Sequence, residues 1–387
     1  MYNASQFGLR FDVVDDLTGK RLGRPSSATF RTADVVGLDT FAHVAKTMET
    51  SLESDPWHAH FALPEWLHTL IANGALGAKT RAGIFKKEGK RIMMFDPATG
   101  EYVPSNQKAD AEVTEILKEQ DWGKKLAALR ASSNPQAQFL WSIFRDCFHY
   151  IAVQAGNIAT TARDIDFAIR WGFGWDMGPL ETWQAAGVQQ VAAWIEEDIA
   201  AGKAMSNAPL PAWLKGVDAF HNDTGSLNFH TGAYDPRSGL DVYQRQYVPA
   251  KLLGESEKVL GDTVFETDVI RAFTLDNKIL VVENRNKMRA ISKDVLEGLN
   301  KAIDIAEERF DALVLWAPDA PFSVGADLKS MMPEFATGNF AAIEQIVKLF
   351  QDTAMRLRYS QTPTVAAVQG FAFGGGCEFV MHSNKVV

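Results

Sequence analysis

The stretch PTVAAVQGFAFGGGCEFVM, residues 363–381, decides how the C-terminal third of this chain folds. It begins with an apolar run rich in β-branched residues, passes through a glycine-rich turn and ends in a helix-like segment that carries Glu378. Three adjacent glycines remove the side chains that would keep a ligand away from the main chain. A helix that starts directly after such a turn adds its positive end. We therefore expect backbone N–H groups to point at one place, as in an oxyanion hole, beside a carboxylate that could act as acid or base.

A second glycine turn lies earlier in the chain. LVLWAP (313–318) predicts a buried strand, and the loop PFSVGADLKSM (321–331) follows it. An amphipathic stretch over 340–359 separates the two turns. In a right-handed βαβ unit, loops that follow parallel strands lie at the same end of the sheet. The N–H groups of Ala326 and Gly375 could then converge on one carbonyl oxygen. Either turn alone is typical of an ordinary βα connection, whereas the pair together with the carboxylate is more specific.

These two loops resemble those of the crotonase, or enoyl-CoA hydratase/isomerase, family. VGADLKSM resembles the first oxyanion loop of that family, and AVQGFAFGGGCEFVM resembles its second loop and first catalytic glutamate. The resemblance implies that the N–H groups of Ala326 and Gly375 bind the oxygen of an acyl thioester. It also implies that Glu378 is a catalytic acid or base, and that Val324 and Lys329 lie near bound CoA.

The resemblance extends upstream. DVIRAFTL and KILVVE, within residues 268–283, predict a strand pair with a turn at Asp276-Asn277, and a helix is expected from Ser292 to about Glu308. The intervening loop NRNKMRAIS corresponds to the family's CoA-binding loop, which often has asparagine where this chain has Arg289. Arg289 and Lys287 make this loop basic. Such a loop suits the 3′-phosphate of CoA, and it equally suits a solvated surface.

The C-terminal domain resembles only part of a crotonase domain. In the family's hydratases a second catalytic glutamate follows the first, at a distance that would fall beyond Val387. We therefore expect residues 266–387 to form the N-terminal half of a crotonase-like domain. The family's isomerases can work with a single glutamate, so isomerase chemistry stays open.

The N-terminal part contains motifs of a different kind. GRPSSATFRTADVVGLDT (23–40) begins with a turn and continues into an amphipathic helix, and LPEWLHTLIANGALGAKTRAGIFKK (63–87) predicts a helix that ends near Asn73-Gly74. Both resemble the C-terminal helical domain of 3-hydroxyacyl-CoA dehydrogenases, although Arg81 stands where that family commonly has glycine. Residues 139–188 resemble a degenerate second copy of the same module. Tandem modules of this kind occur in multifunctional fatty-acid oxidation enzymes that also carry a crotonase domain.

The predicted fold class is therefore α+β and multidomain, with tandem all-α dehydrogenase C-terminal modules and a partial α/β crotonase domain of the ββα-spiral type. The polar, turn-rich stretch DPATGEYVPSNQKAD (96–110) separates the two modules. The predicted boundaries are a helical module over 1–95, a linker over 96–134, a second module over 135–203, a connector over 204–265 and the crotonase half over 266–387.

Cofactor binding is expected mainly from the resemblance. GFGWDMG (172–178) has the wrong spacing for a dinucleotide fingerprint and follows a helical pattern instead of a strand. In the dehydrogenase family the NAD-binding domain precedes the helical domain. The resemblance thus implies NAD for the parent protein, with its binding domain absent from a chain that looks truncated at both ends. His58 and His60 have no Cys/His/Asp cluster around them, so no metal is expected.

Composition narrows the class of protein. The chain has 387 residues, of which 46% are hydrophobic, which is enough for two or three domain cores. The net charge of −9 argues against nucleic acid or an anionic membrane surface as a partner. No secretory signal or apolar span of membrane length is present, and the two cysteines, Cys147 and Cys377, are far apart in sequence. We expect a cytoplasmic protein that acts on acyl-CoA thioesters, and by resemblance the parent enzyme could form a homo-oligomer.

Two kinds of function are consistent with these features. The resemblance implies consecutive steps of fatty-acid β-oxidation: hydration of a trans-2-enoyl-CoA, followed by NAD-linked oxidation of the 3-hydroxyacyl-CoA. The alternative is a catalytically incomplete structural or assembly fragment, or an enoyl-CoA isomerase that uses one glutamate.

Overall fold

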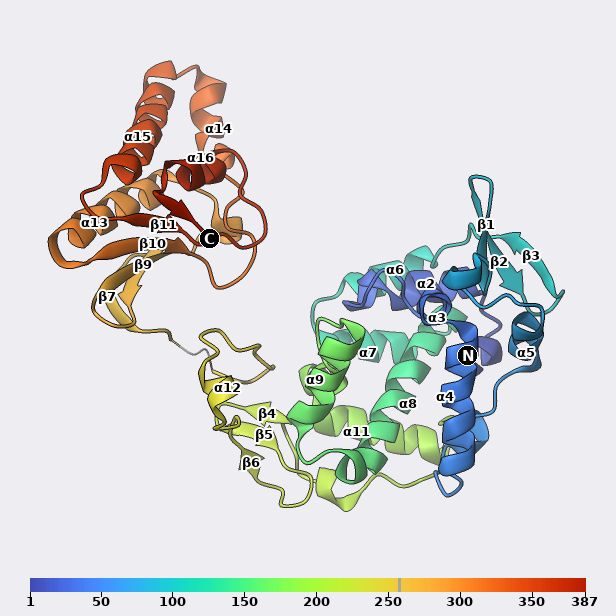
Figure 1. The fold of residues 1–387 in the computed structure, drawn as a ribbon. Helices are drawn as coiled ribbons and strands as arrows, with labels where there is room; N and C mark the ends of the chain where they lie inside the picture. Colours follow the sequence, from blue (N-terminus) through green and yellow to red (C-terminus); the bar gives the residue numbers. More distant parts are fainter. Residues whose placement is uncertain (257–258) are drawn as a thin grey trace. The chain divides into compact units, whose positions relative to one another are not determined.

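The computed structural model describes residues 1–256 and 259–387, which form two compact units (Figure 1). Unit 1 consists of residues 1–240 and 250–256, and unit 2 contains residues 241–249 and 259–387. Each unit has its own hydrophobic core, the first between Ala4 and Phe229 and the second between Ile270 and Phe379. No helix in the described ranges has the length and apolar character that a membrane crossing requires.

Unit 1 is built mainly from helices that surround the long helix α8. Fully buried aromatic side chains, among them Trp141, Phe148 and Trp183, fill its core. Its helices are α1 (Tyr2–Gln6), α2 (Phe11–Thr18), α3 (Phe30–Val36), α4 (Leu38–Ser51), α5 (Glu65–Ala72), α6 (Ala111–Lys118), α7 (Trp122–Ala131), α8 (Pro135–Ile158), α9 (Ala162–Phe173), α10 (Pro179–Ala186) and α11 (Val188–Ala200).

The segment expected to be a linker, 96–134, is folded instead. It contains the end of an antiparallel sheet formed by β1 (Phe85–Glu88), β2 (Arg91–Asp96) and β3 (Glu101–Pro104), followed by α6 and α7. Each of these two helices buries two leucine or valine side chains three or four residues apart, and most of its polar residues occupy the outer face. The polar composition therefore reflects exposed helix faces and turns, and the stretch is part of the core of unit 1.

The connector expected over 204–265 is divided between the units. Its first part forms a small antiparallel sheet of β4 (His221–Asn222), β5 (Gly225–Leu227) and β6 (Tyr234–Asp235). Phe220, Leu227 and Phe229 are buried in the core of unit 1. The aromatic residues of this segment thus serve packing, and the second module extends beyond residue 203.

Two aspartates show that the helical modules repeat a local design. In the first module the carboxylate of Asp15, in α2, accepts hydrogen bonds from the N–H groups of residues 29–31 at the start of α3. In the second module the carboxylate of Asp166, in α9, accepts from those of residues 180–181 at the start of α10. In both cases a neighbouring helix satisfies N–H groups that have no partner within their own helix.

The repeat continues after the capped helix. Gly37 (φ +102°) joins α3 to α4, and Gly187 (φ +91°) joins α10 to α11. Asp34, in the last turn of α3, accepts hydrogen bonds from two consecutive backbone N–H groups at the start of β1. Gln184, in the last turn of α10, accepts hydrogen bonds from two consecutive N–H groups at the start of β4. The two modules therefore share a helix–glycine–helix unit whose end is tied to a small sheet.

Unit 2 is a six-stranded sheet covered by helices. The strand order is β12-β11-β10-β9-β8-β7, with β7, β8 and β9 antiparallel and β9 to β12 parallel. The strands are β7 (Asp262–Glu266), β8 (Ile270–Thr274), β9 (Ile279–Asn284), β10 (Ala312–Trp316), β11 (Thr364–Ala366) and β12 (Lys385–Val386). The helices are α12 (Asp241–Gln244), α13 (Lys293–Arg309), α14 (Leu328–Thr337), α15 (Phe340–Tyr359) and α16 (Gly375–His382).

The sequence pattern predicted this unit well. The β8–β9 pair turns at Asn277, which has a positive φ of 60°. The hydroxyl of Ser292 accepts a hydrogen bond from the N–H of Val295, so Ser292 caps α13 as expected. The helix α15 covers the whole amphipathic stretch 340–359. The predicted combination of helical modules with a partial α/β domain is confirmed.

Candidate active site

The two glycine loops of unit 2 lie side by side. They follow the parallel strands β10 and β11 and so leave the sheet at the same end. The N–H of Ser323 donates to the carbonyl of Phe371 over 3.3 Å, and the N–H of Phe373 donates to the carbonyl of Ser323 over 2.9 Å. Backbone hydrogen bonds therefore join the loops directly.

Several backbone donors in these loops have no partner among the described residues, and those of Ala326 and Gly375 are among them. Neither the N–H of Ala326 nor that of Gly375 donates to another residue in the described part of the chain. A Cβ atom placed on Gly325 would lie 3.3 Å from the nitrogen of Gly375 and 2.7 Å from the carbonyl oxygen of Phe373. The loops thus approach so closely that only glycine fits at 325, and both free donors lie at this junction.

An aromatic ring beneath the second loop fixes where α16 begins. A Cβ atom on Gly375 would lie 2.2 Å from Cζ of Phe350 in α15. The Phe350 ring in turn stacks on Phe379 of α16, with ring centroids 5.0 Å apart. Gly375 is therefore required by packing as well as by the open approach to its N–H group.

Glu378 lies in the first turn of α16, with its side chain exposed. It is three residues after Gly375, and residues at this spacing share one face of a helix. Its carboxylate makes no hydrogen bond or ion pair with another described residue. The carboxylate is therefore available to a ligand near the first turn of α16.

The residues expected near CoA occupy different environments. Lys287 and Lys329 are exposed, and Val324 is half-buried with its N–H donating to the carbonyl of Met288. Arg289 differs from a solvated surface residue, because only 16% of its side chain is exposed and it pairs with Asp319. It does not extend freely into solvent.

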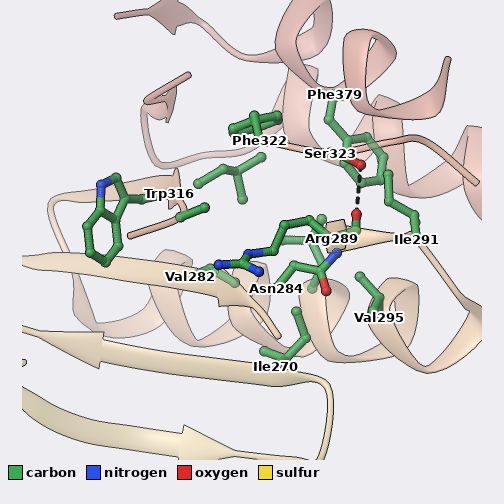
Figure 2. A pocket seen from close by; sticks show the side chains of 13 residues that line it. Ile270, Val282, Asn284, Arg289, Ile291, Val295, Trp316, Phe322, Ser323 and Phe379 are labelled. Carbon is green, nitrogen blue, oxygen red and sulfur yellow. Dashed lines mark hydrogen bonds between the residues drawn. The ribbon is translucent and has the colours of Figure 1, made fainter. Parts of the chain in front are cut away.

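The direction of Arg289 follows from its backbone. Met288 and Arg289 both have a φ of 56°, a left-handed conformation that is uncommon for residues other than glycine. The side chain enters a mostly apolar cavity of about 40 Å³ between the sheet, α13 and α16 (Figure 2). Its Nε atom is buried there without a partner among the described residues. A motif of basic residues gave no indication of this inward turn.

Sequence patterns also did not reveal two residues that shape the site. Phe350 belongs to an amphipathic helix. The sequence pattern predicts that its apolar face is buried, but it does not predict that Phe350 packs against the second loop. Ser323 precedes the first glycine tip and contacts the second loop, a relation between segments that local sequence cannot express.

A second polar constellation lies in unit 1 and is structural. Nε2 of His221 lies 2.7 Å from the carboxylate of Asp166, and its Nδ1 lies 2.8 Å from the hydroxyl of Ser226. All three side chains are shielded from solvent. Since Asp166 caps α10 and no substrate could reach the serine hydroxyl, this arrangement holds the second module together. Elsewhere in the described ranges, no three His, Cys, Asp or Glu side chains gather into a potential metal site.

Comparison with known families agrees with this geometry. Residues 276–387 match the family described as "Enoyl-CoA hydratase/isomerase", and residues 3–87 match "3-hydroxyacyl-CoA dehydrogenase, C-terminal domain". Two separate segments of the chain thus match two different families. The resemblance inferred from its motifs is thereby confirmed.

Individual relatives are similar to this chain over different shares of its length. A "Probable 3-hydroxyacyl-CoA dehydrogenase" from Bacillus subtilis (strain 168) is 32% identical over 98% of this chain and 47% of its own length. A "Putative fatty acid oxidation complex trifunctional enzyme" from Rickettsia felis is 25% identical over 98% of this chain and 48% of its own. An enoyl-CoA hydratase/isomerase structure from Xanthobacter autotrophicus Py2 is 25% identical, with a TM-score of 0.29, over 31% of this chain and 46% of its own. The chain spans about half the length of the curated relatives it matches.

Proposed function

We propose that this chain is part of a bifunctional fatty-acid β-oxidation enzyme, which hydrates trans-2-enoyl-CoA and oxidises the resulting 3-hydroxyacyl-CoA with NAD. The two family matches on one chain and the names of its relatives support this proposal. The observation that carries the hydratase part is that the N–H groups of Ala326 and Gly375 have no partner in two adjoining loops, with the exposed Glu378 in the first turn of α16.

In the proposed hydration step, the thioester carbonyl oxygen accepts hydrogen bonds from both N–H groups. Negative charge develops on this oxygen when water adds at C3, and preorganised donors stabilise that charge more than the neutral substrate. Loss of one such donor typically raises the barrier by about 3 kcal/mol. Glu378 orients the water and takes up its proton, and a second acid must protonate C2.

The CoA part of the substrate is assigned to residues around the first loop. Lys287 and Lys329 present exposed ammonium groups that suit phosphate, and Val324 offers an apolar contact. Arg289 would act here through its ion pair with Asp319 and through the backbone of its loop. A cytoplasmic location and a homo-oligomeric state remain part of this proposal, and the two free cysteines are consistent with a reducing compartment.

NAD is implied for the parent protein by the dehydrogenase relatives. In the described ranges, no G-x-G-x-x-G turn joins a strand to a helix, and residues 172–178 connect α9 to α10 instead. We therefore derive no hydride-transfer step from this chain.

A hydration assay on crotonyl-CoA tests the proposal. We expect slow hydration by the wild-type chain, and we expect Glu378→Gln to lower kcat by about 100-fold or more while the Kd for the thioester changes little, because shape is retained and proton transfer is lost. Glu344→Gln, an exposed carboxylate on α15, is the matched control and should leave both values unchanged.

Three results would redirect the assignment. Full hydration by Glu378→Gln would reject the catalytic role of this carboxylate. Conversion of a 3-enoyl-CoA without hydration would favour the single-glutamate isomerase. Failure of the wild-type chain to bind any enoyl-CoA would favour the structural fragment.

A further inference from the structure

We propose that Ser323 is a positioning residue that sets the spacing between the N–H groups of Ala326 and Gly375; its catalytic consequence rests on the proposed hydratase function. Ser323 is 97% buried, with 3% of its surface exposed, and lies beside the cavity that Arg289 enters (Figure 2). It contacts both glycine loops and the backbone of the basic loop.

The hydroxyl of Ser323 fixes the first loop. It donates to the carbonyl of Arg289 over 2.8 Å (Figure 2). It also accepts from the N–H of Gly325 over 3.0 Å. The carbonyl of Gly325 accepts from the N–H of Ile291 over 2.8 Å. Gly325 has a φ of +92° and a wide range of alternative conformations. Because both ends of this glycine are held, the peptide that carries the N–H of Ala326 keeps one orientation.

The remainder of Ser323 fixes the second loop. Its backbone N–H and carbonyl bond to Phe371 and Phe373, as described above. A Cβ atom on Gly376 would lie 2.6 Å from Cβ of Ser323, so this serine touches the first turn of α16 directly after Gly375. A serine is small enough for this contact and still provides the hydroxyl that orders the first loop.

Removal of the hydroxyl should therefore loosen both donors together. In Ser323→Ala the N–H of Gly325 and the carbonyl of Arg289 lose their buried partner, while the Cβ contact with Gly376 remains. Misplacement of a catalytic group by about 1 Å can cost on the order of 100-fold in rate. For Ser323→Ala we expect kcat to fall by about 10- to 100-fold. The Kd for the thioester should change much less.

Amide hydrogen exchange tests the coupling without relying on activity. In Ser323→Ala, exchange should accelerate in peptides covering 321–328 and also in those covering 371–378, which contain no substitution. Ser330→Ala is the matched control, since its hydroxyl also donates to a backbone carbonyl, that of Asp327, but lies exposed on α14. It should leave the 371–378 peptides unchanged. Ser323→Cys keeps a weak donor and acceptor. Its amide exchange over 321–328 and 371–378 should therefore be intermediate between that of wild type and that of Ser323→Ala.

A chromophoric cinnamoyl-CoA thioester then tests the oxyanion role. Its absorption should shift to the red on binding to wild type, as the carbonyl is polarised, and Ser323→Ala should reduce this shift while far-UV circular dichroism stays native. Unchanged exchange over 371–378 in Ser323→Ala would overturn the coupling. Coupled exchange together with no thioester binding by wild type would reject the proposed function and the oxyanion role of Ser323, but not its contact between the loops.

Discussion

At the scale of single residues, the candidate site depends on positions where no side chain fits. Gly325, Gly375 and Gly376 each face atoms closer than a Cβ could tolerate, namely the opposite loop, the ring of Phe350 and the side chain of Ser323. These glycines allow two loops and a helix end to meet within van der Waals distance. The free N–H groups of Ala326 and Gly375 are a consequence of that close approach.

Gly375→Ala should be strongly destabilising for unit 2. The new methyl group would lie 2.2 Å from Phe350, and such overpacking typically costs about 1–3 kcal/mol or more. Gly172→Ala is the control, because it lies in α9 with no atom within 4 Å of the added Cβ, and it should stabilise the helix by up to about 1 kcal/mol. Thermal unfolding followed by circular dichroism measures both, and equal melting temperatures for the two variants would contradict the prediction.

The buried carboxylate of Asp15 should give unit 1 a pH-dependent stability. Burial raises its pKa from 3.8 to about 6, although three N–H groups act in the opposite direction. The folded state thus binds the proton more tightly than the unfolded chain. The stabilising contribution is complete below pH 3.8 and is lost as the pH rises through about 6. The difference in pKa corresponds to about 3 kcal/mol.

Asp15→Asn isolates this effect. Between pH 4 and 7, the unfolding free energy of wild type should fall relative to that of the variant. Asp16→Asn is the control, because burial of Asp16 is outweighed by hydrogen bonds from Ala109 and Lys108 that lower its pKa. Its contribution is lost only as the pH falls below 3.8, so it should be constant in this range. Urea titrations at each pH measure both differences, and a constant difference for Asp15→Asn would refute the assignment.

At the scale of elements, helix ends are held by side chains from other helices. Asp166 caps α10 and also binds His221, which links α9, α10 and the β4–β6 sheet. Asp164 caps only its own helix, α9, through Thr161. The two aspartates are only two residues apart, but Asp166 joins three elements and Asp164 stabilises only one.

Asp166→Ala should therefore cost more stability than Asp164→Ala. Removal of one partner of a buried pair typically costs about 3–5 kcal/mol, whereas loss of an exposed cap costs about 1 kcal/mol. Urea unfolding followed by tryptophan fluorescence suits this comparison, because nine of the ten tryptophans precede residue 214, in unit 1. Similar losses for the two variants would show that the Asp166–His221 contact contributes little.

At the scale of the whole molecule, two separate cores predict two unfolding transitions. Unit 1 buries residues up to Phe229 in its core, and unit 2 begins its own core at Ile270. In calorimetry, Asp166→Ala should lower the melting temperature of the transition that tryptophan fluorescence also detects. Gly375→Ala should lower the melting temperature of the other transition. Parallel shifts of both transitions in either variant would contradict independent cores.

The sequence by itself determined the local architecture of this protein. Apolar periodicity and an N-cap serine predicted α13 and α15, and short apolar runs predicted β8, β9 and β10. The order of strands and glycine loops placed Ala326 and Gly375 at one end of a parallel sheet. These features could be predicted because they depend on hydrogen bonds and side chains close together in the chain.

Only the tertiary structure decided which distant residues meet. The polar stretch 96–134 became two helices and a strand because their few apolar residues could be buried against the core of unit 1. Arg289 turned inward because its loop is held against residues 323–327, and Ser323 and Phe350 became part of the site through contacts with the second loop. Such contacts form between segments that are far apart in the sequence. The local sequence pattern around each residue therefore does not predict them.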